Sequence, residues 1–164
     1  MSNIIPRYLF FTRGVGIAED KLTSFEDALR DAGIQMLNLV KVSSIIPPKC
    51  RVIDREEGKE FLEPGRITFV VLARNESNRK GDVITASIGY AYFKSLKEYG
   101  YLSEYEGFNE DEYTSSEKAK DIAINMLKTI NKNEKDEIIS GSITQAITVN
   151  NKKWHTVISA AVLI

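Results

Sequence analysis

Two adjacent serines in this chain have the types and the spacing for a reaction of the backbone with itself. Ser43 and Ser44 precede the stiff segment 45–48, which ends in two prolines. The Ser44 hydroxyl could attack the carbonyl carbon of Ser43 and convert the peptide bond into an ester. Removal of the Ser44 α-proton would then expel Ser43 as a carboxylate and leave dehydroalanine, whose hydrolysis releases ammonia and leaves a pyruvoyl group. No side chain carries a ketone, so a protein that needs one must bind a cofactor or break its own backbone.

Such a cleavage requires a peptide held in an uncommon geometry and fixed donors for the developing oxyanion. Pro47 fixes its own φ and biases Ile46 towards an extended conformation, and the β-branched Ile45 and Ile46 have restricted side chains. The exit from the serines is therefore stiff. The competing interpretation is a strand that ends in small polar residues at a proline-stiffened turn, and the spacing alone favours it.

Strands and helices must position this segment, and hydrophobic periodicity predicts about six strands and two helices. The predicted strands are residues 8–12, 36–42, 67–73, 83–93, 142–149 and 154–164. The first helix, residues 22–32, is predicted from a capping box at residues 23–26 and ends at Gly33. The second is predicted to start near Ser115 or Ser116 and to end in the polar run 131–133.

Polar and glycine-rich stretches mark the connections between these elements. Residues 13–16 contain two glycines but lack the third glycine, the lysine and the following helix of a phosphate-binding loop, so they predict a plain turn. Residues 75–82 and 150–152 predict hairpins, and the charged residues 51–65 predict a surface excursion. The mixed order, without a repeating βαβ rhythm, favours an α+β fold with a largely antiparallel sheet.

Composition limits the classes of function. The 164 residues suggest one domain, and 22 basic against 23 acidic residues, with a pI near 5.9, argue against a nucleic-acid partner. Cys50 is the only cysteine, which excludes an intramolecular disulfide and fits a reducing cytoplasm. The sequence has neither a signal-peptide pattern at its start nor an apolar run of about 20 residues for a membrane span. We therefore expect a cytoplasmic protein without a membrane partner.

Four segments together carry a family resemblance. They are residues 25–34 (FEDALRDAGI), 38–48 (NLVKVSSIIPP), 86–89 (ASIG) and 101–108 (YLSEYEGF). In this order they resemble the processing region and the downstream segments of the pyruvoyl-dependent arginine decarboxylases. The last third of the chain fits that family in layout and adds no distinctive motif.

The resemblance implies autocatalytic cleavage of the single domain 1–164 between Ser43 and Ser44, which gives a β chain, 1–43, and an α chain, 44–164. The cofactor would be the pyruvoyl group derived from Ser44, with no metal and no pyridoxal phosphate. It also implies a four-layer αββα sandwich with mainly antiparallel sheets, assembled as homotrimers or hexamers with active sites between protomers.

The implied activity is that of a lyase, a decarboxylase that converts arginine to agmatine and carbon dioxide. The substrate amine would form a Schiff base with the pyruvoyl ketone, and agmatine would feed polyamine biosynthesis or acid resistance. Glu104 matches the family's proton donor. Its simpler interpretation is a solvated surface acid, and Glu106 competes with it for the role.

Two further residues match binding positions of that family. Asn38 lies six residues before Ser44, about 20 Å away along an extended strand, so we expect it to assist processing or binding at a neighbouring subunit's Ser44. The alternative is a polar residue on a half-exposed strand. Glu26 matches the acid that binds the substrate guanidinium, a position more familiar as Asp, and Asp27 follows it. Glu26 could instead serve only the capping box.

Other reactive residue types have structural interpretations. His155 has no companions for a triad or a metal site, so we expect a structural histidine, and Cys50, between Lys49 and Arg51, is expected to be an ordinary thiol. Lys41 could attract the substrate carboxylate, although a solvated lysine is the simpler interpretation. Two alternatives to the arginine decarboxylase remain open: an uncleaved, non-catalytic oligomeric relative, and the same chemistry on another amino acid.

Overall fold

The computed structural model describes residues 4–130 and 136–164, which contain nine strands and three helices. In chain order these elements are β1 (Tyr8–Ala18), α1 (Lys21–Ala32), β2 (Asn38–Lys41), β3 (Ile45–Ile46), β4 (Arg51–Val52), α2 (Arg55–Lys59), β5 (Ile67–Ser77), β6 (Val83–Phe93), β7 (Gly100–Phe108), α3 (Glu112–Lys128), β8 (Ile138–Thr148) and β9 (Trp154–Leu163). Among the described residues, no helix is long and apolar enough to cross a membrane.

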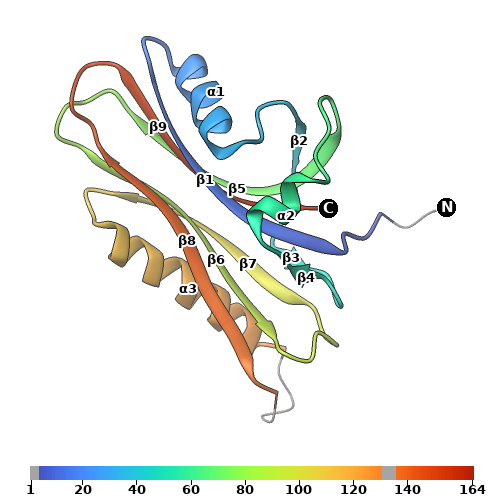
Figure 1. Cartoon of the computed structure of the whole chain (residues 1–164). Coiled ribbons are helices and arrows are strands. Elements are labelled where there is room, and N and C mark those ends of the chain that lie inside the picture. Colours follow the sequence, from blue (N-terminus) through green and yellow to red (C-terminus); the bar gives the residue numbers. More distant parts are fainter. Residues whose placement is uncertain (1–3, 131–135) are drawn as a thin grey trace.

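Two sheets pack face to face, and a long helix covers the outer face of each (Figure 1). The sheet under α1, called the α1 sheet below, has the strand order β2-β5-β9-β1-β4. The sheet under α3, called the α3 sheet, has the order β3-β7-β6-β8. The pairs β1/β4 and β2/β5 are parallel, and the other pairs described are antiparallel. This arrangement confirms the four-layer αββα sandwich with mainly antiparallel sheets.

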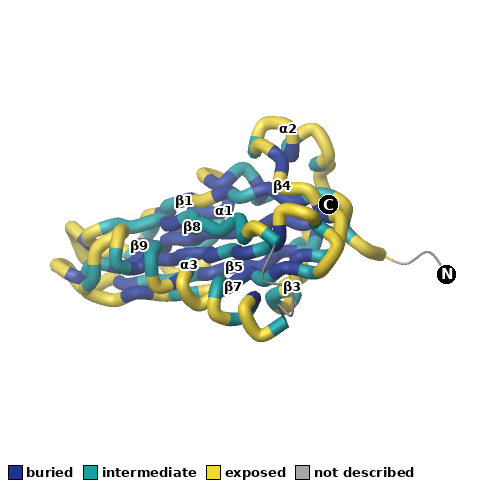
Figure 2. The backbone as a smooth tube through the Cα atoms, turned by 90° about the horizontal axis from the view of Figure 1, so that it is seen from below, coloured by how far each residue is buried: buried dark blue, intermediate teal, exposed yellow. Residues whose placement is uncertain are grey.

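The main hydrophobic core lies between the two sheets. Val71 of β5 and Val157 of β9 meet Ile88 of β6 and Leu102 of β7, and all four are fully buried. Burial of such a side chain contributes about 1.5–3 kcal/mol. Figure 2 shows how burial varies along the chain: buried residues lie mostly on the strands, and exposed residues lie in most of the connections. The core therefore fixes the two sheets against each other, and with them the segments that run between the sheets.

Strand β1 extends past the turn that the two glycines predicted. It continues from Thr12 to Ala18 and pairs with β9 along its length, so the predicted turn at residues 13–16 is wrong. A Cβ atom at Gly14 would lie 2.1 Å from the carbonyl oxygen of Ala28, and one at Gly16 would lie 1.9 Å from that of Ser24. These glycines are required because the backbone of α1 lies directly on β1.

Both long helices begin earlier than predicted, at an aspartate cap. The Asp20 side chain accepts from the Thr23 N–H at 2.8 Å, so α1 starts at Lys21 and the predicted capping box at residues 23–26 is wrong. Asp111 accepts from the Thr114 N–H at 2.7 Å, which starts α3 three residues before Ser115. Gly33 ends α1 in the left-handed region (φ 77°), as predicted. The predicted end of the second helix at residues 131–133 lies outside the described residues.

The chain passes repeatedly from one sheet to the other. The two predicted hairpins are wrong in this respect, because β5 and β9 belong to the α1 sheet whereas β6 and β8 belong to the α3 sheet. Residues 78–82 and 149–153 are therefore crossings between sheets. A third crossing, residues 42–44, joins β2 of the α1 sheet to β3 of the α3 sheet. The predicted surface excursion 51–65 contains the short elements β4 and α2.

Candidate active site at the crossing between the sheets

The crossing that carries the two serines is anchored at both ends by main-chain hydrogen bonds. The Val42 N–H donates to the Val70 carbonyl of β5 at 3.0 Å, in the α1 sheet. The Leu102 N–H of β7 donates to the Ser44 carbonyl at 2.7 Å, in the α3 sheet. The Ser43–Ser44 peptide thus lies between two main-chain hydrogen bonds, one to each sheet.

Unlike the main chain of this crossing, the serine hydroxyls form no hydrogen bonds within the described residues. Ser43 is exposed and Ser44 is half-buried. Side chains alternate along a strand, so Ser44 falls on the same face as Ile46, which is buried between the sheets. Ser44 thus lies directly before β3, two residues from the core between the sheets.

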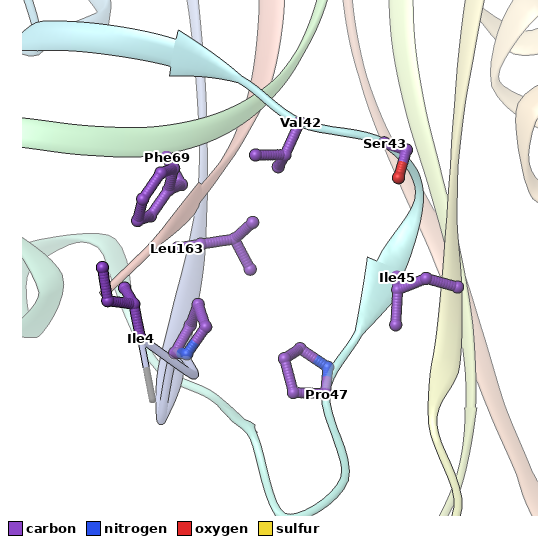
Figure 3. A pocket seen from close by; sticks show the side chains of 8 residues that line it. Ile4, Val42, Ser43, Ile45, Pro47, Phe69 and Leu163 are labelled. Carbon is purple, nitrogen blue, oxygen red and sulfur yellow. The ribbon is translucent and has the colours of Figure 1, made fainter. Parts of the chain in front are cut away.

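A cavity of about 220 Å³ adjoins the crossing (Figure 3). Val42, Ser43 and Pro47 border it on one side, and Phe69 and Leu163, from the ends of β5 and β9, border it on the other. The lining is apolar apart from Ser43. This is space next to the Ser43–Ser44 peptide in which the methylene groups of a small molecule could be accommodated.

Two acidic side chains of β7 lie close to the anchor of Ser44. Glu104 and Glu106 come two and four residues after Leu102, so they share its inward face, and Glu104 lies about 7 Å along the strand. The Glu104 side chain is 31% exposed, and its Oε2 lies 3.5 Å from the Lys41 Nζ of β2. The structure therefore brings Ser44, Glu104 and Lys41 into one region of a single chain.

Glu106 has a pKa above the ordinary value of a glutamate. Burial of its carboxyl is the largest cause, although part of the side chain reaches solvent, and the negative charge of Glu104 adds to it. The main chain of Arg74 and the charge of Lys41 act in the opposite direction. A carboxyl that keeps its proton to higher pH is suited to supply one.

Asn38 and Glu26 lie apart from Ser44 within the chain. Asn38 opens the edge strand β2, and its amide donates to the Gly65 carbonyl at 2.7 Å. Glu26 lies on α1, on the outer side of the α1 sheet, where it pairs with Arg30 at 2.9 Å and its side chain is 44% exposed. One chain therefore does not gather all of the predicted site residues.

The remaining reactive residue types have structural roles. Cys50 is buried in the core between the sheets, and burial raises the pKa of its thiol to about 11. His155 is fully buried, with Nδ1 2.8 Å from the Lys153 carbonyl and Nε2 3.2 Å from Asn150 Oδ1. Within residues 4–130 and 136–164, no group of three or more His, Cys, Asp or Glu side chains is placed to hold a metal ion.

Comparison with known proteins identifies the family. A family model described as "Pyruvoyl-dependent arginine decarboxylase (PvlArgDC)" matches residues 8–164. The chain belongs to this family. The resemblance first indicated by residues 25–34, 38–48, 86–89 and 101–108 is confirmed, and the match also includes the last third of the chain.

Relatives of the pyruvoyl-dependent arginine decarboxylase family match over the full length. The protein of that name in Nitrosopumilus maritimus is 45% identical over 182 residues, which cover 100% of both chains. The one in Thermoplasma volcanium is 43% identical over 180 residues, covering 100% of this chain and 99% of the relative. "Pyruvoyl-dependent arginine decarboxylase 1" of Methanosarcina acetivorans is 43% identical over 165 residues, with the same two shares.

The sequence of this decarboxylase family member did not predict the groups that fix the crossing at residues 42–44. The donors and acceptors at the crossing are the main chains of Leu102 and Val70, which carry no side-chain signal. The proximity of Lys41 to Glu104 depends on β2 and β7, which belong to different sheets. The sequence Leu102, Glu104, Glu106 gives no apolar alternation that would mark these residues as one face of a strand.

Proposed function

We propose that this chain cleaves itself between Ser43 and Ser44 and then converts arginine to agmatine and carbon dioxide. The Ser44 Oγ attacks the Ser43 carbonyl carbon, the peptide C–N bond breaks, and an ester to Ser43 forms. Loss of the Ser44 α-proton expels the Ser43 carboxylate. This elimination leaves a dehydroalanine at position 44. Water then hydrolyses the dehydroalanine, so that its nitrogen leaves as ammonia and a ketone remains. The products are residues 1–43 and a chain 44–164 that begins with a pyruvoyl group.

The observation that supports this proposal is that main-chain hydrogen bonds hold the Ser43–Ser44 peptide to both sheets, whereas neither serine hydroxyl has a partner within residues 4–130 and 136–164. The 2.7 Å hydrogen bond to the Ser44 carbonyl fixes the C-terminal side, and the 3.0 Å hydrogen bond from the Val42 N–H fixes the N-terminal side. An ordinary turn would spend its serine hydroxyls on local hydrogen bonds. The family match over residues 8–164 supports the same chemistry.

The surroundings of Ser44 fit a small ketone and its substrate. The apolar cavity of about 220 Å³ lies on one side, and the Glu104 carboxyl follows on β7. A pyruvoyl group at position 44 would supply a ketone as an electron sink for the electrons released with carbon dioxide. Glu104 donates the proton that replaces the lost carboxyl group on the substrate α-carbon.

Substrate recognition draws on a second subunit in this proposal. Asn38 and Glu26 lie away from Ser44 of their own chain, and Asn38 is on an edge strand that a neighbour can approach. We therefore propose a homotrimer in which these two residues serve the next subunit's pyruvoyl group. The Glu26 carboxylate pairs with the guanidinium of Arg30 at 2.9 Å. We propose that the same carboxylate pairs with the guanidinium of the substrate in the assembled protein.

An assay for agmatine tests the proposed activity. Purified protein is incubated with arginine, ornithine or lysine, and the amine products are measured by mass spectrometry. We expect agmatine to be the main product. Glu104→Gln is expected to cleave normally but to lose on the order of 10²–10⁴-fold in turnover, because the proton donor is gone. A preference for lysine would contradict recognition of the guanidinium, and full turnover by Glu104→Gln would exclude Glu104 as the donor.

A further inference from the structure

A second cavity, called the basic cavity below, lies at the end of the sandwich where β1 begins and the short strand β4 pairs with it (Figure 1). Its volume is about 510 Å³. The cations Arg7, Lys49 and Arg51 line it together with Pro6 and Tyr8, and none of the described residues that line it is Asp or Glu. Pro6 also borders the apolar cavity described above, and the other lining residues of the two cavities differ.

Main-chain hydrogen bonds fix the backbone that carries these three cations. The Arg51 N–H donates to the Arg7 carbonyl at 2.9 Å, and Tyr8 is the register partner of Arg51 in the parallel pair β1/β4. The Lys49 N–H donates to the Leu96 carbonyl at 2.9 Å. Lys49 has a φ of 66°, in the left-handed region that few residues other than glycine adopt. The fold therefore holds the three cations around one cavity.

These cations have no acidic partner within residues 4–130 and 136–164. The ion pairs in this part of the chain involve other lysines and arginines. The sequence holds 22 basic and 23 acidic residues, so a general excess of positive charge does not account for the cluster. Like charges that share one cavity repel each other, and a bound anion offsets this repulsion. All three residues are exposed, so an anion can reach them from solvent.

We propose that the basic cavity binds a small molecule that carries a di- or triphosphate group. The guanidinium forks of Arg7 and Arg51 match pairs of phosphate oxygens, and the Lys49 ammonium adds a third positive charge. The volume lies in the range of small-molecule sites, and Pro6 and Tyr8 offer apolar surface to an organic part of the ligand. The side chains of arginine and agmatine are cationic, so the basic cavity repels the groups that distinguish the substrate and product of the proposed reaction.

The basic cavity contains residues from both sides of the Ser43–Ser44 peptide. Arg7 precedes this peptide bond, whereas Lys49 and Arg51 follow it. The inference goes beyond the proposed function and does not depend on it, because the three cations lie around the cavity in the uncleaved chain. A bound phosphate group would connect the two parts of the chain, so we expect it to raise the melting temperature.

Calorimetric titration of the uncleaved Ser44→Ala protein tests the site. The probes are inorganic phosphate, tripolyphosphate and adenosine triphosphate, without divalent cations. We expect saturable binding of tripolyphosphate and adenosine triphosphate, one per subunit, and weaker binding of inorganic phosphate. Arg7→Gln, Lys49→Gln and Arg51→Gln should each weaken triphosphate binding by about tenfold, because one charge-assisted hydrogen bond is lost. The double variant Arg7→Lys/Arg51→Lys keeps the charge but loses the two forks, so it should also bind more weakly.

A matched control removes the same charge elsewhere. Lys80, Lys128 and Lys152 are exposed and do not line the basic cavity. The triple variant Lys80→Gln/Lys128→Gln/Lys152→Gln should change the affinity by less than about twofold, because distant charges are screened by salt. The triple variant Arg7→Gln/Lys49→Gln/Arg51→Gln should abolish saturable binding. Absence of saturable binding to the parent protein, or an equal loss in the two triple variants, would overturn the proposal.

The three probes also identify which part of the ligand is recognised. Equal affinities for tripolyphosphate and adenosine triphosphate would assign binding to the phosphate groups alone, and a tighter adenosine triphosphate would add a contact to the nucleoside. Both results support the site. Intact mass and the agmatine assay of the wild-type protein decide the proposed function separately. If the wild-type chain neither cleaves nor produces agmatine, the titration of the Ser44→Ala protein still decides whether the basic cavity binds phosphate groups.

Discussion

The chain crosses between its two sheets at residues 42–44 and again at residues 78–82, and it holds the two crossings in different ways. At the second crossing the Ser77 hydroxyl donates to Asp82 Oδ2 at 2.6 Å and accepts from the Arg79 N–H at 3.1 Å. Ser77 and Asp82 are both buried. At the first crossing the main chain is fixed at Val42 and Ser44, and within the described residues the serine hydroxyls are unpartnered.

Serine therefore serves the structure of one crossing, whereas in the other its hydroxyl is left for the proposed cleavage. The Ser77 hydroxyl is held by the turn, because it donates its proton to Asp82 and accepts from the Arg79 N–H. Ser44 is positioned through its carbonyl, so its hydroxyl remains available for attack on Ser43. Rigidity alone is common to both crossings. A serine hydroxyl without a partner among the described residues, beside a fixed backbone, distinguishes the crossing at which we propose cleavage.

Loss of the Ser44 hydroxyl is expected to have the strongest effect on the protein. Ser44→Ala removes the nucleophile, so we expect no cleavage and no agmatine, measured by denaturing electrophoresis and by the product assay. The matched control is Ser77→Ala, which should cleave as the wild type does. Cleavage of Ser44→Ala at the same peptide bond would show that its hydroxyl is not the nucleophile.

A smaller effect is expected at the structural side. In the Ser44→Ala background, Ser77→Ala should lower the free energy of unfolding by about 1–2 kcal/mol, because buried Asp82 and the Arg79 N–H lose a hydrogen-bond partner. Urea denaturation measures this change. Ser43→Ala, in the same background, is the control and should cost little, since Ser43 is exposed. Equal losses at both crossings would contradict the contrast between them.

The ionisation of Glu106, near the first crossing, is expected to change the thermal stability only slightly. The pKa of Glu106 is raised in the folded state, so its ionisation opposes folding above that pKa and has no effect below the ordinary value. In the Ser44→Ala background, Glu106→Gln should therefore raise the melting temperature at pH 7, and the gain should fade as pH falls through the raised pKa and be absent below about pH 4. Thermal melts across this range check the sign. A gain that grows at low pH would contradict a raised pKa.

Local sequence patterns predicted several elements well. Residues 83–93 were predicted as a strand and form β6 with the same bounds, and Gly33 ends α1 as predicted. The failures have a shared cause, because a polar turn does not specify which sheet the next strand joins. Residues 78–82 could therefore be recognised as a connection but not as a crossing. The glycines of β1 reflect a helix backbone above them, which local patterns cannot represent.

The candidate site was predictable to the extent that it is local in sequence. The serine pair and Glu104 were predicted as site residues from segments 38–48 and 101–108, and the structure places both segments close together. Strand β7 was not predicted, because its inward face changes from Leu102 to acids at the edge of the sandwich. The Lys41–Glu104 pair requires strands from two sheets to meet. The roles of Asn38 and Glu26 remain predictions that depend on a second subunit.

Intact mass spectrometry of the purified wild-type protein tests self-cleavage most directly. We predict two species, residues 1–43 with an ordinary carboxyl end and residues 44–164 beginning with a pyruvoyl group in place of Ser44. Reduction of the ketone with borohydride should add two hydrogens to the larger species and block its activity. A single uncleaved chain of 164 residues, under all conditions that support folding, would contradict self-cleavage at Ser43–Ser44 and favour a non-catalytic relative.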